Sequence, residues 1–125
     1  MKHFAIAWLL ACGAVPALAC GACAEDKVAA TYDHASVRDA VARGKVVVYC
    51  DLAGTRDFAR VRTAAARLAG VDTRSVRVSR ENAALSFVLD AKRQSPRAAV
   101  TTLQAALGEH GRVALLKVEG GSAAH

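Results

Sequence analysis

The spacing of apolar residues along the chain predicts the order of its helices and strands. We expect one continuous helix over residues 26–43, because its apolar positions recur at nearly helical spacing and Gly44 would end it. These positions are Val28, Tyr32, Val37 and Val41. The run KVVVYC at residues 45–50 is rich in β-branched side chains and predicts a buried strand.

A second helix is expected over residues 56–69, after a polar loop. Thr55 can cap its start and Gly70 can close its end. One stripe of this segment is apolar, which is typical of a helix that packs on a sheet. The stripe consists of Phe58, Val61, Ala65 and Leu68.

The remaining elements follow from two alternating segments and one amphipathic segment. Residues 75–79 and 85–90 alternate apolar and polar side chains and predict two strands joined by a short hairpin loop. Ser95 followed by Pro96 is a typical helix start, so we expect a helix that reaches Leu107. A last strand is predicted over residues 112–118.

From residue 45 onward the expected order is strand, helix, strand, strand, helix, strand. This order predicts an α+β fold, the ferredoxin-like βαββαβ sandwich, with an antiparallel four-stranded sheet and two helices on one face. The domain would span residues 45–118, with the leading helix as an addition and residues 119–125 as a flexible tail.

The first 19 residues have the features of an export signal. Lys2 gives a charged start, a short apolar run follows, and the small residues that end at Ala19 suit cleavage. We therefore expect a periplasmic or secreted protein whose mature chain begins with an arm and helix over residues 20–44. No later stretch is apolar enough to span a membrane.

Cysteine content and charge narrow the possible functions. Cys12 would leave with the signal, so Cys20, Cys23 and Cys50 remain, and this odd number leaves at least one thiol outside any intramolecular disulfide. Loss of Lys2 lowers the formal net charge from +6 to about +5. Together with export, this moderate charge indicates a solvated basic surface and no nucleic-acid partner.

The sequence lacks the residues that nucleic-acid binding and enzymatic catalysis would require. Nucleic-acid binding on a ferredoxin-like sheet needs aromatic side chains displayed on the central strands, and Tyr49 alone would qualify. No nucleophile triad, phosphate-binding loop or paired acid and base occurs in the sequence, so we expect no enzyme.

The stretch VVVYCDLAGTRDFARVRTAAARLAGVDTRSVRVSRENAALSFVLD resembles the first two-thirds of a heavy-metal-associated domain, and the similarity extends over roughly residues 45–118. That family holds soft metal ions in a Gly-Met-x-Cys-x-x-Cys loop between the first strand and the first helix. In this chain the two cysteine positions are Gly54 and Asp57, while Asp51 and Leu52 stand at the glycine and methionine positions. The resemblance thus implies the fold without its usual metal loop.

Cys20 and Cys23 form a thiol pair outside that loop, and several interpretations of this pair remain open. Two thiolates three residues apart, next to the positive end of a helix, suit a soft metal ion. The pair could also form a structural disulfide or exchange disulfides, although thiol exchange motifs normally follow a strand. A lipid anchor on Cys20 is a further alternative, with Ala17 where a branched residue is preferred.

Two more residues are candidate metal ligands. Cys50 ends the predicted first strand, and an arm folded back over the loop would bring it to Cys20 and Cys23. His34 follows in the leading helix and would join only if the arm doubles back; otherwise Asp33 would accept its hydrogen bond. A site of two or three thiolates suits Cu(I), and the addition of a histidine suits Zn(II).

The leading hypothesis is a small exported protein that binds a soft metal ion, most plausibly Cu(I), and passes it to another envelope metal-handling protein. One alternative is a non-catalytic envelope interaction module whose cysteine pair is a disulfide or a lipid anchor. A weaker alternative is a thiol-disulfide exchange protein.

Overall fold

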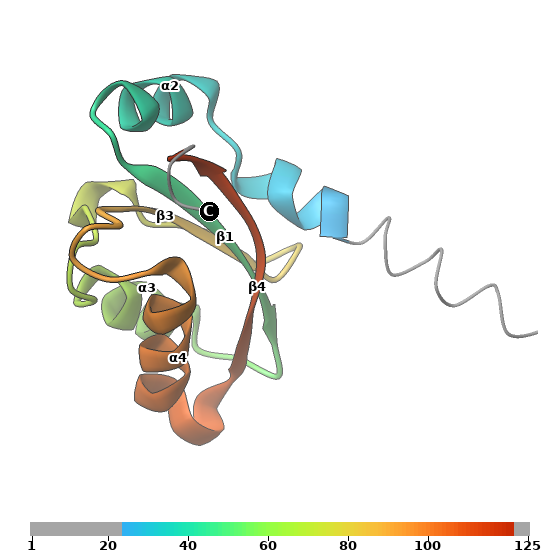
Figure 1. Ribbon diagram of the computed structural model, residues 1–125. Helices are drawn as coiled ribbons and strands as arrows, with labels where there is room; N and C mark the ends of the chain where they lie inside the picture. Colours follow the sequence, from blue (N-terminus) through green and yellow to red (C-terminus); the bar gives the residue numbers. More distant parts are fainter. Residues whose placement is uncertain (1–23, 122–125) are drawn as a thin grey trace, which may run out of the picture.

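The computed structural model describes residues 24–121 of the 125-residue chain (Figure 1). Within this range no helix is long and apolar enough to cross a membrane. The elements in chain order are a first helix over residues 24–31, α2 (His34–Ala42), β1 (Val46–Ala53), α3 (Phe58–Ala66), the short 3-10 helix η2 (Thr73–Ser75), β2 (Arg77–Ser79), β3 (Ala84–Leu89), α4 (Pro96–Leu107), the short 3-10 helix η3 (Gly108–His110) and β4 (Arg112–Gly120).

The four strands form one antiparallel sheet in the order β2-β3-β1-β4, which confirms the predicted ferredoxin-like arrangement. Helices α3 and α4 cover one face of this sheet (Figure 1). Alternate residues of β1 point into the core between the sheet and these helices, where they meet Phe87 of β3 and Leu103 of α4. The residues that β1 contributes are Val46, Val48, Cys50 and Leu52.

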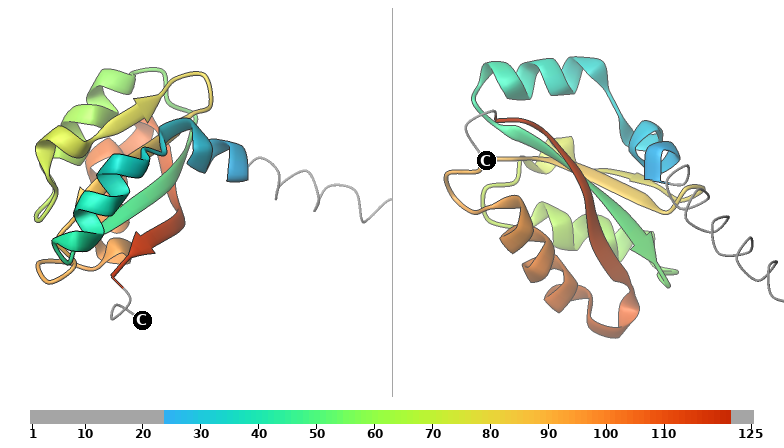
Figure 2. Two further views of the ribbon diagram at one scale, coloured as in Figure 1. Left: turned by 90° about the horizontal axis from the view of Figure 1, so that it is seen from above. Right: turned by 45° about the vertical axis from the view of Figure 1, so that its right-hand side comes forward.

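The opposite face of the sheet is covered as well. The first helix and α2 lie over it, so the sheet is sandwiched between two helical layers (Figure 2). We call residues 24–42 the N-terminal layer. A second apolar cluster forms beneath it, made of Val37, Ala40, Val47, Tyr49 and Val88. Because both faces are covered, all six residues of β3 are buried, including the polar Ser86.

The continuous leading helix predicted over residues 26–43 is wrong. The chain breaks into two helices at Tyr32 and Asp33, and Asp33 caps α2 by accepting a hydrogen bond from the Ala35 amide. An aspartate side chain competes for backbone amides in this way and therefore favours a new helix start over a helix interior. Tyr32 and Val41 are 43% and 48% exposed, so they do not form a buried apolar stripe with Val37.

The start of α3 and the end of β1 also differ from the sequence prediction. Helix α3 is capped by Asp57, whose carboxylate accepts from the Arg60 amide at 3.0 Å, and not by Thr55. Strand β1 continues through Ala53, so it takes up the first residues of the predicted loop. The longer strand pairs with both neighbours, which satisfies backbone groups that a loop would leave to water.

The predicted tail begins two residues later than expected. Glu119 and Gly120 belong to β4 and pair with Val47 and Val46 of β1. Gly120 adopts a φ of +86°, and the chain passes so close to α2 that a Cβ atom there would lie 2.8 Å from Val41 Cγ2 and 3.1 Å from the Lys45 carbonyl. The end of β4 therefore requires a residue without a side chain.

Gly120→Ala is expected to destabilise the fold by about 2–4 kcal/mol, because left-handed backbone strain adds to overpacking against Val41. Gly44→Ala is the matched control, since Gly44 has a similar φ of +74° and nothing within 4 Å of the added Cβ. We expect it to cost only about 1 kcal/mol in urea unfolding. Equal losses in the two variants would show that the approach to α2 contributes nothing.

Candidate functional site

The predicted thiol pair, Cys20 and Cys23, lies outside the described residues. The structure instead places the segment that follows it. Ala24, the residue after Cys23, is the first described residue of the helix over 24–31. Any site formed by the two thiols is therefore connected directly to this helix.

Lys27 fixes the first helix to the sheet. Its ammonium lies 2.8 Å from Asp51 Oδ1 and donates to the carbonyls of Asn82 and Ala83 at 2.6 and 3.2 Å. Asp51 follows Cys50 in β1, and Asn82 belongs to the turn between β2 and β3. One side chain thus joins the helix next to the thiol pair to two separate parts of the domain.

Cys50 is a buried thiol, as expected, and it points away from the N-terminal layer. It lies in the core between the sheet and helices α3 and α4, with none of its surface exposed. Burial, followed by the neighbouring Asp51 carboxylate, raises the pKa of Cys50 to about 12. At neutral pH this group is a neutral thiol. The sheet separates Cys50 from the first helix, while Cys20 and Cys23, which were expected to reach it, lie outside the described residues.

His34 is exposed at the first position of α2. Its Nδ1 lies 3.3 Å from the Tyr32 hydroxyl. The expected hydrogen bond from His34 to Asp33 is not formed, because Asp33 is used elsewhere. Its carboxylate accepts from Ser36 Oγ at 2.7 Å and from Arg77 at 2.8 Å.

The Asp33 carboxylate joins the N-terminal layer to β2. Hydrogen bonding from Ser36 makes the largest contribution to a lowered pKa, and the Arg77 guanidinium lowers it further. Arg77 also donates to Ser36 Oγ at 2.9 Å. This three-residue contact fixes the start of α2 against the sheet and leaves His34 on the outside.

The loop that holds metal ions in heavy-metal-associated domains has no ligands here. Gly54 has a φ of +67°, and Asp57 is occupied as the cap of α3. A cavity of about 440 Å³ lies at this end of the molecule and is lined by one carboxylate, that of Glu109. Across residues 24–121, no group of three or more His, Cys, Asp or Glu side chains is placed to hold an ion.

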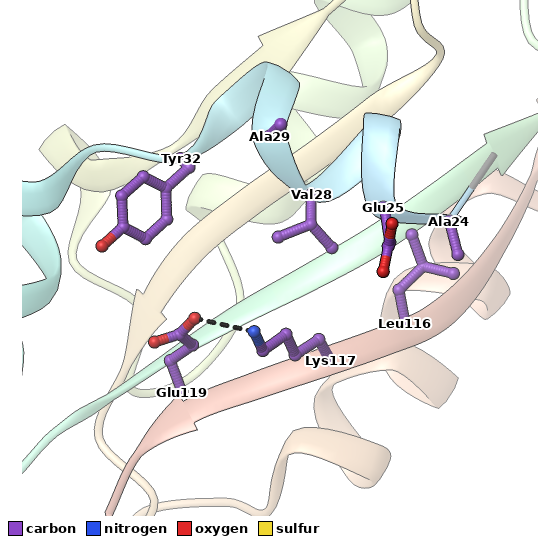
Figure 3. A pocket seen from close by; sticks show the side chains of 8 residues that line it. All are labelled: Ala24, Glu25, Val28, Ala29, Tyr32, Leu116, Lys117 and Glu119. Carbon is purple, nitrogen blue, oxygen red and sulfur yellow. Dashed lines mark ion pairs between the residues drawn. The ribbon is translucent and has the colours of Figure 1, made fainter. Parts of the chain in front are cut away.

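A groove of about 560 Å³ runs between the first helix and β4, beginning beside Ala24 (Figure 3). Figure 3 shows Val28 of the first helix and Leu116 of β4 on the two sides of the groove, with Lys117 and Glu119 paired along β4. The distance between the last two side chains is 3.0 Å. The complete lining is Ala24, Glu25, Val28, Ala29, Tyr32, Leu116, Lys117 and Glu119. The groove exists because the first helix covers β1 and β3 but leaves the face of β4 open.

Tyr49 lies in the cluster beneath the N-terminal layer and is 1% exposed. Its hydroxyl and the Thr31 hydroxyl have no hydrogen-bond partner among the described residues. Burial raises the pKa of Tyr49 to about 12, and nearby Glu119 contributes in the same direction. The expectation that Tyr49 might display a ring for base stacking is therefore wrong, because the N-terminal layer covers it.

Lys27 and Asp51 are the residues that the sequence prediction missed. A lysine on the predicted leading helix and an aspartate at the end of a buried strand are ordinary surface residues when considered singly. The signal that could have indicated their pairing is the run from Val46 to Cys50, whose apolar residues at successive positions indicate that both faces of the sheet are covered. A covered second face requires the leading segment to fold back.

No family model matches the chain, and no curated protein matches it. A search of solved structures finds a crystal structure of oxidized MerP from Ralstonia metallidurans CH34, with 17% sequence identity and a TM-score of 0.48. The match covers 58% of this chain and 99% of that chain. A likeness at this level says nothing about what the present chain binds.

Proposed function

We propose that this chain is a non-enzymatic, exported protein that binds a soft metal ion, Cu(I) in the first place and Zn(II) less tightly, through Cys20 and Cys23. The observation that supports this assignment is the position of the third thiol. Cys50 is buried on the far side of the sheet with a pKa of about 12, so it is not available as a thiolate. The pair before the first helix is then the chain's remaining thiolate source.

The domain acts in this proposal as a carrier. Lys27 holds the first helix on the sheet, and this helix directly follows the thiol pair in the sequence. Two-thiolate coordination leaves Cu(I) open to a third ligand from a partner. Transfer to another envelope metal-handling protein proceeds by stepwise exchange of thiolates, and no electron transfer is needed.

The test is competition for Cu(I) with a chromophoric Cu(I) chelator under anaerobic, reducing conditions. The exported protein is expected to withdraw one Cu(I) per chain, and Cys20→Ser with Cys23→Ser to withdraw none. Cys50→Ala is the matched control and is expected to compete as the parent does, because its thiol is buried. Equal competition by the parent and the double serine variant would contradict the proposal.

A non-catalytic envelope interaction module is the second candidate. It is favoured by the lack of a metal-ligand group within residues 24–121. The intact mass of the exported protein separates the two: loss of two hydrogen atoms indicates a disulfide, and a diacylglyceryl-plus-acyl increment indicates a lipid anchor. A disulfide that resists reduction in the folded protein would favour this candidate over metal binding.

A further inference from the structure

Strand β4 forms one edge of the sheet, and among residues 24–121 no strand pairs with its outer side (Figure 1). It is nine residues long and contains no proline. The other edge, β2, is only three residues long. Arg62 donates to the Val76 carbonyl just before it, and Arg77 of β2 donates to Ser36 of α2. A long edge strand without proline presents unpaired backbone groups to which another strand can add.

An irregularity in β4 divides the strand into two halves. Tyr49 pairs with Lys117 and the next residue, Cys50, pairs with Leu115, so Leu116 is an extra residue in β4. The extra residue shifts the alternation by one. As a result Val113 and Val118, which are five positions apart, both pack toward α3 and α4.

Leu115 also packs toward α3 and α4, whereas the next side chain, Leu116, faces the N-terminal layer. Lys117 and Glu119 line the groove beside the first helix, and Arg112 and Ala114 alternate with Val113 onto this same face. Glu119 is already paired with Lys117 at 3.0 Å. Arg112 is exposed and has no ion pair within the described part of the chain.

We propose that β4 pairs with β4 of a second copy, antiparallel, in the register that places Arg112 opposite Glu119. In this register Val113 lies opposite Val118 and Ala114 opposite Lys117, and each of these pairs has both members on one face. A regular strand would put residues of opposite parity on different faces, so the extra Leu116 makes this register possible.

The sequence of β4 is self-complementary in this arrangement. The two-fold axis generates two Arg112–Glu119 contacts and two Val113–Val118 contacts, one at each end of the paired segment. Shifting the register by two residues would instead bring Arg112 opposite Lys117, which is repulsive. This charge pattern favours a second copy of the chain over an unrelated strand.

Pairing would also complete the groove of Figure 3. Because the axis is perpendicular to the sheet, both N-terminal layers lie on the same side. The open face of β4 in each copy would then adjoin that of the other, forming one trough with a first helix along each wall. The proposal stands apart from metal binding, since it uses no cysteine.

Sedimentation equilibrium of the exported, reduced protein tests the pairing. We expect a monomer–dimer equilibrium that Arg112→Glu and Glu119→Arg each weaken about tenfold, by placing like charges opposite one another at two symmetric contacts. The swap variant, Arg112→Glu with Glu119→Arg, restores opposite charges and should dimerise within about threefold of the parent. Arg74→Glu, an exposed change on η2, is the control and should have no effect.

Amide hydrogen exchange locates the interface. On concentration, residues 112–120 should gain protection, while residues 77–79 of β2 should not. Circular dichroism confirms that each variant is folded, so that loss of dimer is not loss of structure. A chain that stays monomeric near about 1 mM, a dimer protected elsewhere than β4, or a swap variant that fails to recover would each overturn the proposal.

Discussion

A chain that begins at Lys45 is expected to unfold or aggregate, although the resemblance to heavy-metal-associated domains suggests that residues 45–118 form a complete domain. Removing the N-terminal layer exposes Val47, Tyr49 and Val88, which the intact protein buries almost completely. These side chains would also lose their contacts with α2. We therefore expect the free energy of unfolding to fall by on the order of 5 kcal/mol, which is comparable with the whole stability of a small domain.

Urea unfolding followed by circular dichroism checks this expectation, with size-exclusion chromatography to detect aggregation. The matched control begins at Ala24 and keeps the whole N-terminal layer. We expect it to unfold at the same urea concentration as the exported protein. A stable, monomeric 45–121 fragment would show that the second face of the sheet does not need its cover.

Alkaline pH should destabilise the fold through Cys50, which gives the second large effect. Burial raises the pKa of this thiol from an ordinary value of 9.0 to about 12. The unfolded chain therefore loses the proton near pH 9, while the folded chain keeps it until about pH 12. Between these values the unfolded state binds fewer protons, so the free energy of unfolding falls as the pH rises, by up to about 1.4 kcal/mol per pH unit.

The measurement is urea unfolding at a series of pH values above 8, in a Cys20→Ser, Cys23→Ser background where a single thiol titrates. By pH 12 the loss should approach about 4 kcal/mol relative to neutral pH. Cys50→Ala in the same background should remove most of this slope. Tyr49 adds a smaller fall in the same direction, since its pKa is also raised to about 12. Identical slopes with and without Cys50 would contradict the account.

The second half of the chain was predictable from local signals. Ser95 followed by Pro96 gives α4 its start, and Ser95 accepts from the Ala98 amide at 3.1 Å, as a helix cap does. The order of strands and helices from residue 45 follows from short-range periodicity alone. This order was enough to predict the fold class, because a βαββαβ order with short connections leaves few alternative arrangements.

The N-terminal layer was not predictable in the same way, because its structure depends on long-range contacts. The alternation in β3 indicated one buried face, yet Ser86 and Val88 are buried by residues more than fifty positions earlier. The break at Asp33 depends on contacts with Ser36 and with Arg77, which lies on a distant strand. Helical periodicity depends only on the spacing of apolar residues along the sequence, so it does not reveal contacts between distant residues.

The candidate site was predicted only in part for a related reason. Burial of Cys50 followed from its position on an apolar strand, and the structure confirms it. The sequence did not show that Cys50 lies on the face of the sheet opposite the N-terminal layer. The anchoring of the first helix by Lys27 depends on Asp51 and on the turn at Asn82, which come together only in the folded chain.

Native mass spectrometry of the exported protein, reduced anaerobically and offered Cu(I) and Zn(II), tests the central claim most directly. The account predicts one Cu(I) per chain in the parent and in Cys50→Ala, and none in Cys20→Ser with Cys23→Ser. Folding of each variant is verified by its charge-state distribution. Retention of the ion by the double serine variant, or no bound ion in the parent, would contradict the claim that the thiol pair before the first helix is the metal site.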